Sequence, residues 1–268
     1  MLQAVDVTFG YDDAVVVRDV SLDVADDGFV GIIGPNGSGK TTLLRLLAGT
    51  RTPVQGRVTL DGVPLASLHR AAIARRMSVV PQETHLAFEY SALEVVLMGR
   101  YPHLGAFAVE GPADLAIARE ALGSTGTREL EHRPFSTLSG GEKQRVIIAA
   151  ALAQISGHGP GAPTFLLLDE PTAALDLKYQ LGVASLLRSL HRAPGLSVIV
   201  STHDLNFAAS LCRTLVMLKH GRVIAAGPVD EVLTSSRIRE LYEVDAEVAR
   251  HPRTGHLTVT PIGDGDRA

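Results

Sequence analysis

The residues best suited to chemistry form a glycine-rich loop between positions 34 and 42. The loop follows the apolar run 29–33, which is typical of a buried strand, and precedes the helix-like run 43–47. In this context glycines let backbone N–H groups approach phosphate oxygens, and the helix start adds further donors. Lys40 can reach the outer phosphates, and the Thr41 hydroxyl can bind Mg²⁺. We therefore predict a nucleotide site, with contacts from Gly34, Pro35, Asn36, Gly37, Ser38, Gly39, Lys40, Thr41 and Thr42.

Two acidic residues, Asp169 and Glu170, follow the apolar run 165–168. Open α/β sheets bind their ligands at the carboxyl ends of such buried strands. We expect Asp169 to hold Mg²⁺ through its water shell and Glu170 to orient and polarise an attacking water molecule. Paired acids at a strand end are also common in solvated turns, so this prediction depends on the phosphate loop elsewhere in the chain.

A second run of small residues, 138–142, opens a helix-like segment at 143–154. Bare N–H groups at a helix start favour an anion. A capping box, in which Ser139 and Glu142 bond each other's backbone, explains the local pattern and does not exclude the anion. One chain then has two phosphate-binding helix starts, which a sandwich of two subunits could combine. The candidate anion contacts here are Ser139, Gly140 and Gly141.

Three further side chains are expected at the ends of strands. His203 follows the apolar run 196–200, and Gln82 follows the short run 76–80. We expect His203 to be the functional histidine at the same sheet edge, and the Gln82 amide to sense Mg²⁺ or water. Tyr11 could stack on an adenine ring, although from this residue alone a packed aromatic at a strand end is the better interpretation.

The elements that must position these residues alternate between strands and helices, which predicts an α/β fold with a mainly parallel sheet. Short, fully apolar runs are typical of buried parallel strands. The N-terminal runs alternate partially and are separated by a turn, so we expect a small antiparallel β-subdomain there. The predicted antiparallel strands are 2–8, 15–24 and 57–60; the predicted core strands are 76–80, 165–168, 196–200 and 214–218, with a helix at 178–190.

The stretch 83–137 differs in character and is predicted to be an inserted helical subdomain. It contains helical segments at 91–98 and 113–122, separated by several glycines and prolines. We expect a flexible loop at 157–163. The whole chain, 1–268, is then one domain, with a nucleotide-binding core at 1–82 and 138–240 and a C-terminal extension at 241–268.

Composition limits which partners and which cellular compartment we expect for this chain. A net charge of −4 does not favour nucleic acid, because a phosphate backbone attracts a basic surface. The single cysteine, Cys212, excludes an internal disulfide and fits a reducing compartment. No apolar run approaches the ~18 residues of a membrane helix, and the N-terminus lacks the pattern of a signal peptide. We expect a soluble, cytoplasmic chain.

In order and spacing, these motifs resemble the nucleotide-binding subunit of ATP-binding cassette transporters, over nearly the whole chain. The resemblance implies that ATP and Mg²⁺ are bound, with Glu170, His203 and Lys40 as catalytic residues. It also implies a head-to-tail homodimer in which Ser139 and Gly141 of one subunit contact the γ-phosphate held by the other. Ala173 departs from the serine common in the family's D-loop. The matching motifs are the phosphate loop 34–42, Gln82, 138–142, 166–170, 174–176, His203 and the aromatic Tyr11.

Weaker motifs are similar to importers of iron–siderophore complexes, haem and cobalamin. They are found at 86–88, 94–103 and 176–180. Such a subunit would be a peripheral protein at the cytoplasmic face of the inner or plasma membrane. It would contact a permease through 90–101 and serve a substrate-binding protein indirectly. The alternatives are the ATPase of an exporter, or a soluble cassette ATPase of translation or DNA repair.

Overall fold

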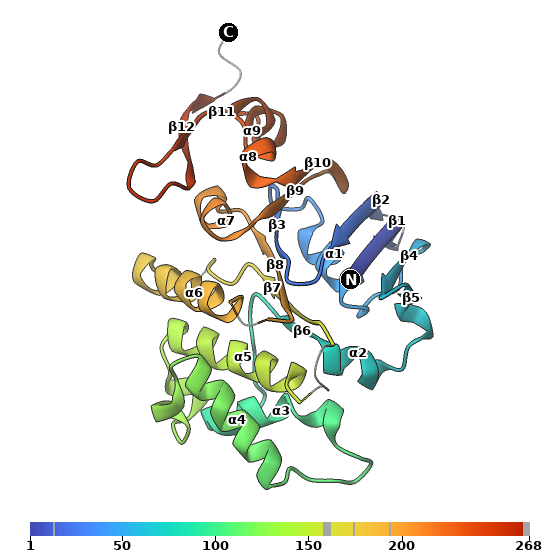
Figure 1. Ribbon diagram of the computed structural model, residues 1–268, viewed down its shortest axis with the longest axis vertical. Helices are drawn as coiled ribbons and strands as arrows, with labels where there is room; N and C mark the ends of the chain where they lie inside the picture. Colours follow the sequence, from blue (N-terminus) through green and yellow to red (C-terminus); the bar gives the residue numbers. More distant parts are fainter. Residues whose placement is uncertain (13, 158–161, 174, 193, 265–268) are drawn as a thin grey trace. The chain divides into compact units, whose positions relative to one another are not determined.

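The computed structural model describes residues 1–12, 14–157, 162–173, 175–192 and 194–264 (Figure 1). Residues 158–161 of the predicted loop, Ala174 of the D-loop motif and the last residues of the C-terminal extension lie outside these ranges. The chain divides into two units, one of Met1–Ser67 with Val198–Ala268 and one of Leu68–Ser197. The division into core, helical insert and extension stays a prediction.

The N-terminal part of the first unit is an antiparallel sheet in the order β2-β1-β4-β5, as the partial alternation predicted. Leu2 of β1 pairs with Val24 of β2 on one side and with Leu60 of β4 on the other. All three side chains are buried, because every second residue of these strands faces the core. The strands are β1 (Leu2–Tyr11), β2 (Ala14–Val24), β4 (Gln55–Leu60) and β5 (Val63–Pro64).

The first unit also contains the parallel strands around the phosphate loop. Strand β3 pairs in parallel with β8 on one side and with β9 on the other, and β10 joins β9 antiparallel. Every residue of β3 and β8 is buried, which explains their continuous apolar sequence. The strands are β3 (Phe29–Ile33), β8 (Leu196–Thr202), β9 (Thr214–Lys219) and β10 (Arg222–Pro228).

The rest of the first unit comprises short helices and a C-terminal hairpin. The predicted extension at 241–268 contains a two-stranded antiparallel pair, in which Val248 faces Val259. Buried Ala246 and Val259 give this hairpin a small apolar face. These elements are α1 (Lys40–Leu47), the 3₁₀ turn η1 (Leu65–Ser67), α7 (Leu205–Leu211), α8 (Val229–Val232), α9 (Ser235–Tyr242), β11 (Val244–Arg250) and β12 (Leu257–Asp264).

The second unit places helices around the parallel pair β6 (Met77–Val80) and β7 (Thr164–Asp169). The predicted helices at 91–98, 113–122, 143–154 and 178–190 are all present. No helix in the described ranges is long and apolar enough to cross a membrane. The helices are α2 (Arg70–Arg76), α3 (Ala92–Met98), α4 (Pro112–Ser124), α5 (Gly140–Ile155) and α6 (Leu177–Leu190), with 3₁₀ turns η2 (Tyr101–His103), η3 (Arg128–Leu130) and η4 (Phe135–Thr137).

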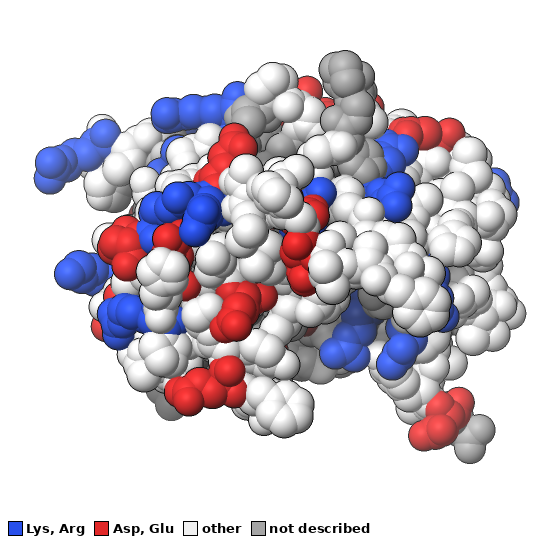
Figure 2. All heavy atoms as spheres, turned by 90° about the horizontal axis from the view of Figure 1, so that it is seen from below, with Lys and Arg blue, Asp and Glu red and all other residues white. Residues whose placement is uncertain are grey.

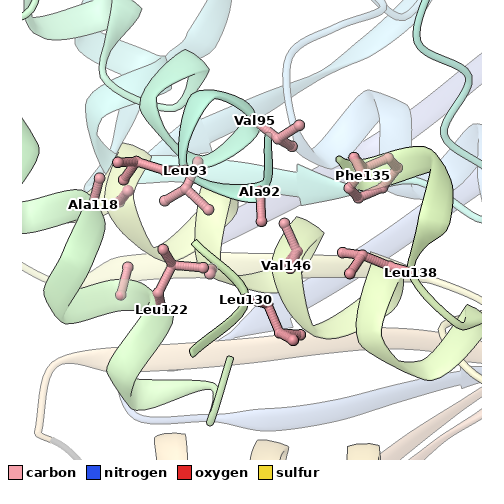
Figure 3. Packing of buried hydrophobic residues seen from close by; sticks show 13 residues of the cluster. Ala92, Leu93, Val95, Ala118, Leu122, Leu130, Phe135, Leu138 and Val146 are labelled. Atoms are coloured by element: carbon pink, nitrogen blue, oxygen red, sulfur yellow. The ribbon is translucent and has the colours of Figure 1, made fainter. Parts of the chain in front are cut away.

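Helices α3, α4 and α5 share one hydrophobic core (Figure 3). Ala92, Leu122 and Val146, one from each helix, are fully buried in it. Arg100, just after α3, ties the cluster to the end of α5. It donates to the Ala153 carbonyl oxygen at 2.6 Å, while its Nε lies 3.0 Å from an Asp114 carboxylate oxygen. Helix α5 is therefore held in place along its length by packing against α3 and α4 and by the Arg100 bond near its end.

Candidate functional site

The phosphate loop connects β3 to α1. Gly39, the N-cap residue of α1, has φ 103°, a conformation that residues with a side chain rarely adopt. Lys40 is only 5% exposed, and its Nζ donates to the carbonyl oxygens of Gly34 at 2.9 Å and Pro35 at 3.2 Å. The loop therefore curls around its own lysine, which holds the ammonium group at the helix start.

Ser38 provides the physical sign that this loop receives a ligand. Its side-chain oxygen is buried and has no hydrogen-bond partner among the described residues. A buried hydroxyl without a partner costs stability, so such groups are usually satisfied by something bound. The backbone around it is fixed, since its N–H donates to Pro35 and its carbonyl accepts from Gly221. The hydroxyl and the adjacent helix start suit a phosphate oxygen.

His203 lies at the same edge of the sheet as the phosphate loop. Parallel pairing sets Ile33 of β3 opposite Thr202 of β8, so Gly34 and His203 are the next residues on neighbouring strands. The side chain of His203 is exposed. Asp204 then caps α7, accepting from the Phe207 N–H at 2.9 Å. The structure thus brings His203 and the phosphate loop together, as their sequence context predicted.

Tyr11 ends β1 with its side chain 38% exposed. Its ring packs edge-to-face against Phe9, with centroids 5.1 Å apart. Its hydroxyl accepts from the Arg45 guanidinium of α1 at 3.4 Å. Burial alone would raise the pKa of Tyr11, but hydrogen bonds from Thr42 and Arg45 hold it below its ordinary value. The ring is packed at the strand end, and enough of it is exposed for stacking.

Gln82 and Glu170 come together in the second unit. Val80 of β6 pairs with Leu168 of β7, so the two residues lie two positions beyond equivalent points on parallel strands. Both line one cavity of about 210 Å³, together with Gly140 and Gln144 from the start of α5. Glu170 has φ 45°, a left-handed conformation that turns the chain sharply after the strand. The predicted base and the predicted sensing amide therefore share one cavity.

Asp169 is the last residue of β7 and is only 7% exposed. Asp169, Thr41 and Gln82 would supply oxygen ligands, which is the chemistry that Mg²⁺ prefers. The described residues contain no group of three His, Cys, Asp or Glu side chains placed to hold a metal ion. The predicted donor set has a single carboxylate, which fits a Mg²⁺ ion that is bound mainly by phosphate and water.

The start of α5 has the capping box that was predicted. The Ser139 N–H donates to Glu142 Oε2 at 2.8 Å, and the Glu142 N–H donates back to Ser139 Oγ at 3.4 Å. The Ser139 hydroxyl also donates to the same carboxylate, at 2.9 Å. The bond from the Ser139 backbone N–H is the main reason that the pKa of Glu142 is lowered. The helix start is therefore fixed, while its next N–H groups remain available to an anion.

The sequence did not predict two side chains that hold this region together. A Cβ atom on Gly141 would lie 2.1 Å from Cδ1 of Tyr179, so the ring of Tyr179 closes over the glycine. Gln180, the next residue of α6, donates its side-chain amide to the Leu175 carbonyl at 2.9 Å. That contact ties α6 to Leu175, just before the helix begins. The only sequence signal was the motif at 176–180, which gives no indication of contact partners.

Comparisons with known proteins identify the family of this chain. A family model described as ABC transporter matches residues 17–173. The hemin import ATP-binding protein HmuV of Gloeobacter violaceus is 43% identical over 249 residues, which cover 92% of this chain and 89% of that protein. The cobalamin import ATP-binding protein BtuD of Halobacterium salinarum is 40% identical over 93% of this chain. The chain spans only 60% of that relative's length.

A solved structure of a metal-chelate-type ABC transporter in an inward-facing conformation has the same fold. It superposes with a TM-score of 0.83 at 29% identity, over 97% of this chain and 96% of that one. The likeness therefore covers both units and the C-terminal hairpin, beyond the matched segment 17–173. With the family model matching more than half of its residues, this chain belongs to the ABC transporter family as an ATP-binding subunit.

Proposed function

We propose that this chain is the ATPase subunit of an ABC importer of the haem, cobalamin or metal-chelate type. Relatives named for hemin and cobalamin import, and a metal-chelate-type transporter, support this class of cargo. The observation that carries the hydrolytic role is the cavity shared by Gln82 and Glu170. A carboxylate and an amide beside one small space suit a water molecule that attacks a phosphoryl group.

ATP binds with its phosphates in the loop 34–42. The Lys40 ammonium leaves the carbonyl oxygens of Gly34 and Pro35 and binds the β- and γ-phosphates. The Ser38 hydroxyl then hydrogen-bonds to a phosphate oxygen. The Tyr11 ring stacks on the adenine. Mg²⁺, held by Thr41, Asp169 and Gln82, would neutralise phosphate charge when bound.

Hydrolysis then depends on where charge develops. Glu170 orients the attacking water and accepts its proton. His203 donates a hydrogen bond to the γ-phosphoryl group, and Lys40 stabilises the negative charge that grows on it. These groups act by position, because a dissociative phosphoryl transfer requires little covalent help from the protein.

Two copies of the chain close head to tail around two ATP molecules. Each chain has two helix N-termini that suit an anion, one at α1 and one at α5. A single bound nucleotide does not need both N-termini of the same subunit. Ser139 and Gly141 of one subunit therefore contact the γ-phosphate in the other, with Gly140 between them. Hydrolysis removes these contacts, so closure has two states and can drive motion in a partner.

The partner is a permease, which the helical insert contacts at the cytoplasmic face of the membrane. The insert exposes large apolar side chains on either side of α3: Phe88 is 74% exposed and Tyr101 58%. Viewed from the side of α3 and α4, basic and acidic groups are interspersed among uncharged surface (Figure 2). Apolar groups on a surface without one dominant charge suit a protein partner. A substrate-binding protein would take part only through the permease.

A single variant tests the role of Glu170 and the dimer together. Glu170→Gln keeps the size of the side chain but removes the base. We expect ATP affinity to be retained, steady-state turnover to fall by about a hundredfold or more, and an ATP-dependent dimer to accumulate. Turnover is measured by phosphate release, and mass in solution by light scattering. Undiminished turnover would rule out Glu170 as the base.

Ser139→Arg, made alone and in the Glu170→Gln background, is the matched test of the cross-subunit contact. In the proposed dimer the arginine blocks the phosphate that the partner subunit holds. We expect hydrolysis and dimer formation to be lost while a fluorescent ATP analogue still binds. Loss of that binding too would show that Ser139 acts within its own subunit.

A further inference from the structure

The helix that follows His203 is tied to the C-terminal hairpin by one side chain, Asn206. Its Nδ2 donates to the Val259 carbonyl oxygen at 3.3 Å, and the Val259 N–H donates to its Oδ1 at 2.8 Å. The amide thus pairs with the edge of β12 as a neighbouring strand would. Only a side chain with a donor and an acceptor side by side can make both bonds, and asparagine has the right length.

The hairpin is itself fixed, so it can act as an anchor. Arg239 of α9 pairs with Asp245 of β11 at 2.7 Å, and Arg250 of β11 pairs with Asp230 of α8 at 2.9 Å. The Val259 side chain is buried where β12 packs on α7. Two exposed ion pairs and one apolar contact together attach the hairpin to α7, α8 and α9, although each exposed pair alone is weak.

Helix α7 needs such an anchor because it is short and because His203 lies directly before its N-cap residue, Asp204. A helix of seven residues is unstable on its own and depends on tertiary contacts. Asp204 caps it, and the Asp204 N–H donates to Thr202 Oγ1 at 3.0 Å. His203 is the single residue between the end of β8 and that cap. Any shift of α7 therefore moves the backbone of His203.

We propose that Asn206 is a positioning residue for ATP hydrolysis: by tying α7 to the C-terminal hairpin, it holds His203 where the γ-phosphoryl group arrives. This inference rests on the proposed function, in which His203 contacts that group. The hairpin is then part of the catalytic apparatus rather than an appendage. The hairpin then affects the stability of the transition state, and so kcat. It does not affect ATP affinity, because ATP binding depends on the phosphate loop.

The test compares Asn206→Ala and Asn206→Asp in the full chain, measuring kcat and KM for ATP. Alanine removes both bonds, whereas aspartate keeps the acceptor but sets its other carboxylate oxygen against the Val259 carbonyl oxygen, which repels it. We expect kcat to fall roughly tenfold for both variants. KM should change by less than about twofold, because the lost interaction matters in the transition state. Wild-type kcat in both variants would overturn the proposal.

Two controls separate positioning from a general loss of structure. Thr258→Val removes a bond within the hairpin, from the Thr258 hydroxyl to the Ala249 carbonyl at 3.1 Å, and should leave kcat unchanged. In a His203→Ala background, Asn206→Ala should cause no further loss of the residual turnover, measured at high enzyme concentration. A further tenfold loss there would show that Asn206 does not act through His203.

The same background distinguishes this inference from the proposed function. If His203→Ala itself leaves turnover unchanged, the role proposed for His203 is wrong. If His203→Ala abolishes turnover while both Asn206 variants behave as wild type, only the role of Asn206 is wrong. Should Asn206→Ala unfold, the aspartate variant still carries the test, because it keeps the 2.8 Å contact to the Val259 N–H.

Discussion

At the scale of single residues, Tyr11 shows how one side chain can satisfy two explanations. Its ring packs against Phe9, while its hydroxyl is held by Arg45 of α1, and a large part of the ring is exposed. The hydroxyl contact fixes the ring next to the helix that follows the phosphate loop. A ring fixed in this way loses little freedom when a purine stacks on it, which favours binding.

Two substitutions separate the ring from its hydroxyl. Tyr11→Ala removes the stacking surface and should raise KM for ATP about tenfold, since stacking of a base on an aromatic ring contributes ~1–3 kcal/mol. Tyr11→Phe keeps the ring and loses the hydrogen bonds of its hydroxyl with Thr42 and Arg45, so KM should rise by no more than about twofold. Steady-state kinetics with ATP measure both. An unchanged KM in the alanine variant would leave Tyr11 as a packing residue alone.

At the scale of elements, the contact between α5 and α6 sets the space at the start of α5, where we propose the second anion site. The ring of Tyr179 lies over Gly141, where an added Cβ would meet Cδ1 at 2.1 Å. Gly141→Ala should therefore force the two helices apart. We expect its unfolding midpoint to fall by several degrees, as for other overpacked sites in a chain of this size.

The matched control for this prediction is the neighbouring glycine. A Cβ on Gly140 would lie 3.4 Å from Cδ2 of Leu175, a contact that a small shift accommodates. Gly140→Ala should melt close to wild type in the same calorimetric scan. Adding Tyr179→Ala to Gly141→Ala should recover most of the decrease in the unfolding midpoint, because the crowding ring is removed. If the two glycine variants melt alike, the ring does not crowd Gly141.

The elements also show which parts of the structure a sequence can predict. The starts of α3 and α5 were predictable, because Ser91 with Glu94 and Ser139 with Glu142 are local patterns with a local cause. The ends of β3, β7 and β8 were equally predictable from short apolar runs followed by polar residues. Asn206 was not, because its partner Val259 lies 53 residues away. Neither was the hairpin, whose strands carry several charged residues and one narrow apolar face.

At the scale of the whole molecule, acid is expected to destabilise the second unit through its helix starts. The pKa values of Glu94, Asp114 and Glu142 are lowered, in each case mainly by a bond from the backbone N–H of the residue at the helix cap. A carboxyl whose pKa is lower in the folded state stabilises the fold above its unfolded pKa. That contribution is lost as the pH falls through the folded value, because both states are then protonated.

The unfolding midpoint should therefore fall below about pH 4.5, the ordinary pKa of a glutamate. The double variant Glu94→Gln and Glu142→Gln keeps the shape of both capping boxes without the charge. It should be less stable than wild type at pH 7, by roughly 0.5 kcal/mol for each site, because a negative charge favours a helix start. The difference should shrink as the pH falls through the folded pKa values, since wild type then loses the same charges. A gap that stays constant from pH 7 to pH 3 would mean that the effect is steric, and the acid sensitivity would have to come from other carboxylates.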